Sequence, residues 1–355
     1  MRRQTPLESL IVAMIREDGP MPLDRYMALC LGHPLHGYYM SRDPFGPEGD
    51  FITAPEISQI FGELVGIWCA AAFQALDAPR QFNLIELGPG RGTLMSDILR
   101  AACVMPGFCE AARIHLVETS PTLRRLQAGK LGAAATWHEA VESIPDGPSI
   151  IIANEFFDAL PIRQYEFHQG RWMERRIGLS ADDRLVIGRT AFPLARPPGA
   201  EGAIFETGPS RDDIAHLLGA RLARSAGAAL VFDYGHAASA LGDTLQAVRR
   251  HEFCSILDRP GEADLTSHVD FEGLADAFRR GGAVPHGPIT QRQFLLAMGI
   301  ETRAALLSRK AGPAERRVMD NATERLAGEN QMGNLFKVMA ATSPGLATPY
   351  PFGAS

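Results

Sequence analysis

Short apolar runs alternate with amphipathic stretches along residues 82–235. Four runs have the length of buried strands, "FNLIEL", "RIHLVE", "SIIIAN" and "GAALVFDYG", and helical spacing follows in "TLMSDILRAA" and "SPTLRRLQ". Strands that alternate with helices predict a parallel sheet covered by helices on both faces. The run "GNLFKVMAA" near the C-terminus predicts a last strand. The expected fold class is therefore α/β.

The first eighty residues predict helices. Thr5 is placed to cap a first helix, with Pro6 in its first turn and Gly19 at its end. The segment "TAPEISQIFGELVGIWCAAAFQAL" predicts a second helix that begins after the cap Thr53, with Glu56 three positions on as in a capping box. This helix is apolar on nearly every side, which is typical of a buried helix. Charged residues in the first helix leave its apolar stretch too short for a secretory signal.

Residues 163–205 interrupt the alternation of strands and helices. The stretch "RQYEFHQGRWMERRIGL" alternates residue types around a His-Gln-Gly turn, as a hairpin does, and a stretch rich in Pro and Gly follows. We therefore expect an inserted lobe, rich in β-strands and helices, that binds the substrate. The predicted parts are a helical N-terminal region or lid, a ligand-binding core, and this insertion: residues 1–80, residues 81–162 with 226–345, and residues 163–225.

Composition limits the function classes. The chain has 355 residues, 46% of them hydrophobic, and a formal net charge of −6, which suits a large α/β domain with an elaboration. The mild acidity does not indicate nucleic-acid binding, and no apolar run is long enough to predict a membrane span. Five cysteines without a Cys-x-x-Cys pair predict neither a disulfide framework nor a metal site, so we expect a cytoplasmic protein.

A glycine turn, "ELGPGRGT", follows the first strand and precedes a helix. Gly88, Gly90 and Gly92 stand where α/β sheets bind ligands. Their spacing is G-x-G-x-G, whereas dinucleotide enzymes favour G-x-G-x-x-G, and position 93 is Thr. Glu86 would repel a pyrophosphate but suits a ligand that carries an amine and a sulfonium. The turn therefore favours S-adenosylmethionine (SAM), and a turn without any ligand is the alternative.

Glu118 and Trp137 follow the strand ends on the same side of the predicted sheet. Glu118 ends "RIHLVE", where a carboxylate can accept hydrogen bonds from both hydroxyls of a ribose. Its alternative role is a favourable negative charge at the start of the next helix. Trp137 lies where a residue could contact an adenine.

Two further strands end in polar residues. Asn154, Glu155 and Asp158 lie in "ANEFFDALP" after the third strand, and Asp233 lies in "DYGH" at the end of the fourth. Carboxylates there would orient a guanidinium through paired hydrogen bonds. Helix capping or a plain polar strand end is the alternative in each case. We expect Glu155, Asp158 and Asp233 to serve catalysis and Asn154 to bind the cofactor.

Taken together, these segments resemble the MidA family of SAM-dependent methyltransferases. The resemblance rests on "GDFITAPEISQIFGE", "ELGPGRGTLMSDILR", "VETSPTLRRLQ", "ANEFFDALPIRQYEF", "GDTLQA", "DLTSHVDF" and "MGNLFKVM", in this order. The family includes a mitochondrial complex I assembly factor that methylates an arginine. The resemblance implies a class I methyltransferase (Rossmann-like) fold, SAM as the methyl donor and a protein arginine as the acceptor. The matching residues are Glu86, Gly88, Gly90, Gly92, Glu118, Asn154, Glu155 and Asp158.

The leading hypothesis is a SAM-dependent protein arginine N-methyltransferase. It would act on a protein partner, a subunit of the respiratory NADH:quinone oxidoreductase (complex I), during assembly. The first alternative is an assembly chaperone that binds SAM without turnover. A nicotinamide-dependent oxidoreductase is the second alternative, and both the glycine spacing and Glu86 disfavour it. The acceptor, the number of methyl groups and the oligomeric state are open at this point.

Overall fold

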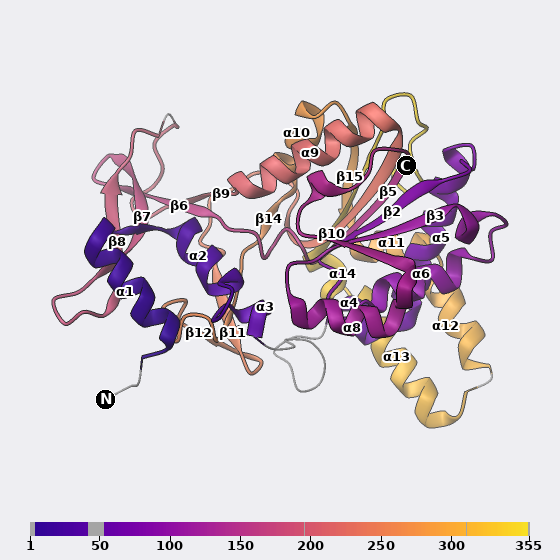
Figure 1. Ribbon diagram of the computed structural model, residues 1–355, viewed down its shortest axis with the longest axis horizontal. Coiled ribbons are helices and arrows are strands. Elements are labelled where there is room, and N and C mark those ends of the chain that lie inside the picture. The colour runs from indigo at the N-terminus through magenta and orange to yellow at the C-terminus, as the bar shows by residue number, and fades with distance from the viewer. Residues whose placement is uncertain (1–3, 42–52, 195, 310, 354–355) are drawn as a thin grey trace. The chain divides into compact units, whose positions relative to one another are not determined.

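The computed structural model describes residues 4–41, 53–194, 196–309 and 311–353. Within these residues the chain forms two compact units (Figure 1). Unit 1 contains the described residues of Met1–Phe51, Asp158–Asp212 and Ser239–His268, and unit 2 contains those of Ile52–Phe157, Asp213–Ala238 and Val269–Ser355.

Unit 2 is built on one large sheet. Its strands, in spatial order, are β15 (Val284–Thr290), β16 (Phe336–Thr342), β10 (Gly227–His236), β5 (Ser149–Asn154), β2 (Phe82–Leu87), β3 (Ala112–Val117) and β4 (Ala135–His138), and β14 (Val269–Asp270) pairs with β10. The five strands from β10 to β4 run parallel, whereas β16 is antiparallel to both of its neighbours. The predicted parallel sheet and its last strand are therefore confirmed.

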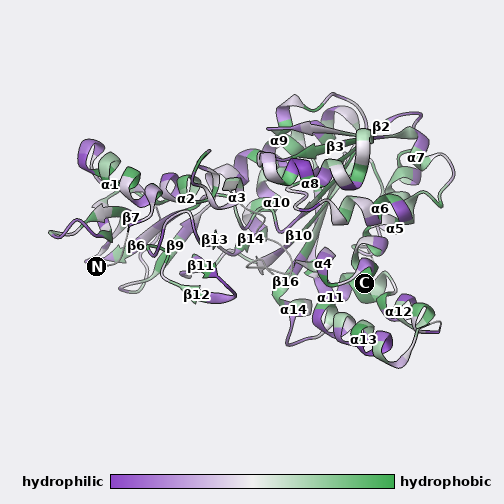
Figure 2. Cartoon of the chain, turned by 60° about the horizontal axis from the view of Figure 1, so that its bottom comes forward, coloured by the Kyte–Doolittle hydropathy of each residue, from purple (hydrophilic) through white to green (hydrophobic). Residues whose placement is uncertain are grey.

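Helices cover both faces of this sheet. Figure 1 shows α5 (Gln59–Ala75), α6 (Thr93–Ala102) and α8 (Pro121–Leu131) on one side, and α9 (Pro209–Ser225) and α10 (Phe271–Arg280) on the other. Every residue of β2 and β5 is buried, as expected for parallel strands between two helical layers. Figure 2 accordingly shows green, hydrophobic strands at the centre of this unit, whereas α8 carries purple, hydrophilic segments.

The remaining elements of unit 2 are short or lie at its C-terminal end. They are α7 (Phe108–Ala111), η1 (Gly132–Ala134), η2 (Val141–Ser143), α11 (Gln291–Ala297), α12 (Ile300–Ser308), α13 (Pro313–Ala327) and α14 (Met332–Leu335). Across the described part of the chain, no helix has the length and apolar character that a membrane span requires.

The helix expected from Thr53 to residue 76 is broken in two. Helix α4 (Ala54–Ile57) ends at Ser58, whose backbone is extended, and α5 begins directly after it. The Ser58 side chain accepts a hydrogen bond from the backbone N–H of Ile60 and so caps α5. Glu56, expected to complete a capping box with Thr53, instead contacts Thr93. A long-range hydrogen bond thus replaces the local one that the sequence suggested.

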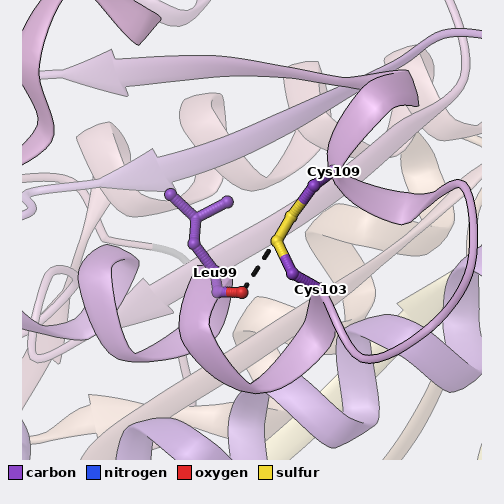
Figure 3. The surroundings of a disulfide bond; sticks show 3 residues. All are labelled: Leu99, Cys103 and Cys109. Carbon is purple, nitrogen blue, oxygen red and sulfur yellow. Dashed lines mark hydrogen bonds between the residues drawn. A yellow bond between two sulfur atoms is a disulfide. The ribbon is translucent and has the colours of Figure 1, made fainter.

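A disulfide bond joins Cys103 to Cys109 across the loop between α6 and α7 (Figure 3). The Cα atoms of the two residues lie 5.3 Å apart, and the sulfur of Cys109 lies 4.0 Å from the carbonyl oxygen of Leu99. The expectation that the cysteines form no disulfide is therefore wrong. The six-residue spacing has no recognisable motif, and the fold of the loop brings the two side chains together.

The described residues of unit 1 form three helices, a five-stranded sheet and a three-stranded sheet. Its elements are α1 (Pro6–Asp18), β1 (Met21–Pro22), α2 (Leu23–Gly32), α3 (Tyr38–Ser41), β6 (Arg163–His168), β7 (Arg171–Leu179), β8 (Leu185–Ala191), β9 (Ile204–Thr207), β11 (Gln246–Arg249), β12 (Glu252–Cys254) and β13 (Asp264–Thr266). Strands β6 and β7 form the predicted hairpin around Gln169 and Gly170, which both adopt positive φ angles. Thr5 and Gly19 bound α1 as predicted.

These boundaries differ from the predicted parts. The first eighty residues do not form one region, because α1 to α3 belong to unit 1 and α5 belongs to unit 2. Residues 239–268, expected in the core, belong to unit 1, and most of α9, expected in the insertion, belongs to unit 2. Hydrophobic burial explains the difference, since Leu265 is buried with α1 and α2, while Leu218 and Leu222 of α9 are fully buried.

Two buried histidines connect three strands of the large sheet. His115 on β3 places Nε2 3.1 Å from Oδ1 of Asn83 and Nδ1 2.9 Å from Nε2 of His138. Both hydrogen bonds can form with neutral imidazole rings if Nε2 of His115 donates to Asn83 and Nδ1 of His115 accepts from His138. Burial, His138 and Arg221 lower the pKa of His115 to about 4, and burial also lowers the pKa of His138.

We predict that the free energy of unfolding falls as the pH drops from 6.5 toward 4. In this range the unfolded chain binds protons at His115 and His138 that the folded chain does not bind, so acid favours unfolding. The His115 contribution is about 2 kcal/mol. Urea denaturation at several pH values measures the slope. His115→Gln should flatten it, whereas His216→Gln, at an exposed position, should leave it unchanged; equal slopes in all three proteins would contradict the prediction.

Candidate functional site

Strands β2 and β5 are neighbours in the sheet, but the chain leaves them in opposite directions. From β2 it proceeds to β3 and β4 at one edge, and from β5 it proceeds to β10 and β16 toward the other. Ligands of open α/β sheets bind outside the carboxyl ends of the strands at such a reversal. The glycine turn follows β2 here, and the Asn154–Glu155 segment follows β5.

Each of the three glycines of the turn has a left-handed backbone. Gly88, Gly90 and Gly92 have φ angles of 61°, 52° and 74°, a region that residues with a side chain rarely adopt. A Cβ on Gly88 would lie 3.0 Å from the ring of Phe156, and one on Gly92 would lie 3.4 Å from the side chain of Gln127. The backbone therefore favours glycine at all three positions, and at Gly88 the ring of Phe156 also leaves little room for a side chain.

Glu86, near the end of β2, is a buried carboxylate. It is 2% exposed, and its Oε2 atom has no hydrogen-bond partner in the described part of the chain. Burial and the nearby Glu118 raise the pKa of Glu86 to about 8, against the smaller opposing effects of the Met95 backbone N–H and of Lys130. A cation close to Oε2 would lower this pKa and restore the charged form.

Glu118, directly after β3, is also buried, and its orientation is fixed. Its Oε1 accepts the backbone N–H of Ser120 at 2.8 Å, and its Oε2 accepts from Nε2 of Gln127 at 3.2 Å. Burial is the largest cause of the raised pKa of Glu118. Two buried carboxylates thus lie at the carboxyl ends of adjacent strands, which disfavours an anionic ligand.

The residues after β5 adopt a strained turn. Glu155 has a φ angle of 49°, unusual for a residue with a side chain. Its Oε1 atom accepts hydrogen bonds from the backbone N–H of Ala54 at 3.3 Å and from Nδ2 of Asn154 at 3.2 Å. Oδ1 of Asn154 is buried without a hydrogen-bond partner among the described residues. This turn therefore contacts α4 and presents a polar atom that needs a donor.

The other two predicted catalytic carboxylates, Asp233 and Asp158, differ in their surroundings. Asp233 is fully buried at the end of β10, and its oxygens accept the backbone N–H groups of Phe157 and Tyr234, each at 3.0 Å. It therefore fixes the loop after β5. Asp158 is the first residue of a segment of unit 1, where its carbonyl oxygen accepts the N–H of Ser267. Within unit 2 the structure brings together only Glu155 and Asp233 of the three.

Sequence reasoning missed a polar contact that joins α4 to the glycine turn. The hydroxyl of Thr93 donates to Oε1 of Glu56 at 2.5 Å and accepts from Nζ of Lys130 at 2.6 Å. Arg91 lies 4.0 Å from the same Glu56 carboxylate. Thr93 stands where dinucleotide enzymes have the last glycine of their motif. Here it connects α4, the segment before α5, to the glycine turn. The sequence shows a threonine at position 93, but it does not show that this threonine binds Glu56.

The unpaired buried atoms indicate what the site can bind. Buried polar groups are nearly always hydrogen-bonded, so Oε2 of Glu86 and Oδ1 of Asn154 require donors. SAM carries an ammonium group, a sulfonium and two ribose hydroxyls, which supply donors and positive charge. No group of three side chains suited to a metal ion occurs in the ranges that the structure describes. The residues present therefore fit an organic cation with hydroxyl groups.

Comparisons with known proteins agree with this chemistry. Residues 64–289 match the family model described as "Putative S-adenosyl-L-methionine-dependent methyltransferase". The chain is 38% identical to the Drosophila melanogaster "Protein arginine methyltransferase NDUFAF7 homolog, mitochondrial", over 92% of this chain and 83% of the relative. It is 34% identical to the Homo sapiens mitochondrial protein arginine methyltransferase NDUFAF7, over 95% and 83% of the two chains.

A solved structure is similar along nearly the whole chain. A Burkholderia thailandensis protein bound to S-adenosyl-homocysteine gives a TM-score of 0.83 at 27% identity, and the match covers 98% of this chain and 96% of that one. The methyltransferase fold and SAM as the cofactor are confirmed by these matches. The expected cytoplasmic location is wrong, because the similar curated relatives are named as mitochondrial proteins.

We predict that Glu86→Gln stabilises the ligand-free protein, and more so at pH 9 than at pH 5. As the pH rises from about 4.5 to about 8, the unfolded chain loses a proton that folded Glu86 keeps. The stability of the wild type therefore falls through this range, whereas a glutamine does not titrate. Urea denaturation at both pH values measures the difference. Glu142→Gln, at an exposed position, should show no such trend, and a pH-independent effect of Glu86→Gln would contradict the raised pKa.

Proposed function

The chain belongs to the MidA family of SAM-dependent methyltransferases, and we propose that it methylates an arginine side chain of a protein. The relatives named as protein arginine methyltransferases match more than nine-tenths of this chain, which supports the acceptor. The observation that carries the proposal is the pair of buried carboxylates, Glu86 and Glu118, beside a turn of three left-handed glycines. This arrangement favours a cationic nucleoside.

On the cofactor side, each group of SAM has a candidate partner. The unpaired Oε2 of Glu86 would accept from a positively charged donor, and the carboxylate of Glu118 would accept from the ribose hydroxyls. Asn154 supplies a further acceptor. The glycines allow the ligand to approach the backbone. The proposed cofactor-binding residues are Glu86, Gly88, Gly90, Gly92, Glu118 and Asn154.

On the acceptor side, Glu155 is the strongest candidate. In methyl transfer a nitrogen–carbon bond forms while the sulfur–carbon bond breaks, so the guanidinium must be held in line with the methyl group. A carboxylate orients a guanidinium, which has donors and no acceptor. Asp233 supports this role by binding the backbone of the Glu155 loop, so we assign it to positioning. Asp158 is kept as a candidate from the unit 1 segment.

The partner we propose is a subunit of complex I during its assembly. The name NDUFAF7 of the curated relatives and the family resemblance support this partner. A chaperone that binds SAM without turnover is the alternative, which the relatives named as methyltransferases disfavour. Detection of methylarginine separates the two.

We predict that the purified chain transfers labelled methyl groups from SAM to arginine in a lysate from cells that lack this gene. Glu155→Gln, which keeps the shape but removes the charge, should lower the rate at least tenfold while changing SAM affinity less than threefold. Scintillation counting, acid hydrolysis and mass spectrometry of the labelled band measure rate, amino acid and partner. Glu139→Gln, at an exposed position, is the control. Label in another amino acid would refute the acceptor, and no label would favour the chaperone.

We also predict that Gly90→Val lowers SAM affinity at least a hundredfold. A branched side chain at a φ angle of 52° is strained and would occupy space beside the ligand. Calorimetry measures the affinity. Gly299→Val is the matched control, because Gly299 also has a left-handed φ angle, 87°, but faces open space. Unchanged affinity in a folded Gly90→Val variant would disprove the assignment of the turn.

A further inference from the structure

Gln127, on α8, has a fully buried side chain that contacts three separate segments. Its Nε2 donates to the carbonyl oxygen of Gly90 at 2.7 Å and to Oε2 of Glu118 at 3.2 Å. Its Oε1 accepts from the indole N–H of Trp137 at 2.8 Å. One amide thus connects the glycine turn, the end of β3 and strand β4.

The orientation of this amide is determined by its partners. An indole N–H can only donate, and a backbone carbonyl can only accept. The oxygen of Gln127 must therefore face Trp137, and its nitrogen must face Gly90 and Glu118. Both protons of the amide are used, as expected for a buried polar group. No other orientation of the Gln127 side chain satisfies all three neighbours.

The sequence of α8 explains why Gln127 reaches this position. Ser120 caps the helix by accepting the N–H of Leu123, and Leu123 and Gln127 lie one turn apart on the buried face. Gln127 also packs against Gly92, where an added Cβ would lie 3.4 Å from its Cγ atom. The side chain therefore contacts the glycine turn through its carbon atoms as well as through its amide.

The hydrogen bond to Glu118 has a consequence for ribose recognition. A carboxylate offers about four lone pairs on its two oxygens. Ser120 uses one on Oε1, Gln127 uses one on Oε2, and the backbone of Thr119 also donates to the carboxylate, which leaves acceptor capacity for a ribose hydroxyl. Without Gln127 the carboxylate would lose its side-chain partner at Oε2 and could rotate away from the ribose hydroxyls.

We propose that Gln127 is a positioning residue for SAM, which sets the preference of the site for a ribose by holding Glu118 and the Gly90 carbonyl in one arrangement. This inference rests on the proposed cofactor site. It assigns Gln127 no contact with the reacting atoms. If Gln127 served only the stability of the core, its replacement would change the stability of the protein but not the preference of the site for a ribose.

The test compares binding of S-adenosyl-homocysteine with binding of its 2′-deoxy analogue by calorimetry. The wild type should prefer the ribose form at least tenfold. Gln127→Met, of similar volume but without hydrogen-bonding groups, should reduce this preference to about that of Glu118→Ala. In the Glu118→Ala background, Gln127→Met should cause no further loss of preference, since both changes remove the same interaction.

Two further variants separate positioning from stability. Gln291→Met is the matched control, because Gln291 is fully buried and donates to the carbonyl oxygen of Leu326; it should lower the melting temperature but keep the preference. Trp137→Phe removes the donor to Gln127 at a half-buried position and should reduce the preference about threefold, which tests the proposal even if Gln127→Met does not fold.

The outcomes are distinct. An unchanged ribose preference in folded Gln127→Met, or in Trp137→Phe when Gln127→Met does not fold, would overturn the positioning role of Gln127. Failure of the wild type to bind S-adenosyl-homocysteine would instead refute the proposed cofactor site. A tenfold loss of preference that is absent from the Glu118→Ala background would support the proposal.

Discussion

Strands β2 and β5 lie side by side in the sheet, yet the chain continues from them toward opposite edges. No connection can therefore cover the carboxyl ends of these two strands, and ligand chemistry gathers there. Glu86 and the glycine turn follow from the end of β2, and Asn154 and Glu155 follow from the end of β5. The histidine chain around His115, the helices on both faces and the buried strands hold this reversal in place.

Burial of the Glu86 carboxylate is unfavourable in the free protein, and the proposed binding of a cationic cofactor gives a reason for it. A buried carboxylate with one unpartnered oxygen, as at Oε2 of Glu86, is unfavourable, and burial accordingly raises the pKa of Glu86 to about 8. A cationic ligand removes this penalty, so part of the cost in the free protein is recovered on binding. Glu118 differs, because Ser120 and Gln127 already satisfy one lone pair on each oxygen. Glu86 therefore keeps one oxygen without a partner, whereas both oxygens of Glu118 are held by hydrogen bonds.

Local signals explain which features could be predicted. The strands, the Thr5 cap, the hairpin at Gly170 and the glycine turn each depend on a few adjacent residues, so the sequence indicated them correctly. The break at Ser58 was missed, because Glu56 binds Thr93 instead of the backbone of its own helix. The boundaries of the two units were missed for the same reason, since they depend on packing between distant segments. The disulfide between Cys103 and Cys109 was missed because its six-residue spacing has no recognisable motif and only the fold of that loop pairs the two side chains.

The sequence by itself determined the α/β fold and the cationic cofactor, and it supplied the residues proposed to bind that cofactor, because glycine spacing and strand-end carboxylates are encoded within short segments. Only the tertiary structure decided which partners these residues bind and in which unit they lie. It gave Asp233 a backbone-binding role, placed Asp158 in unit 1, and set Gln127 between Gly90 and Glu118. Hydrogen bonds between residues 37 or more positions apart leave no local pattern, so such roles appear only when the chain is folded.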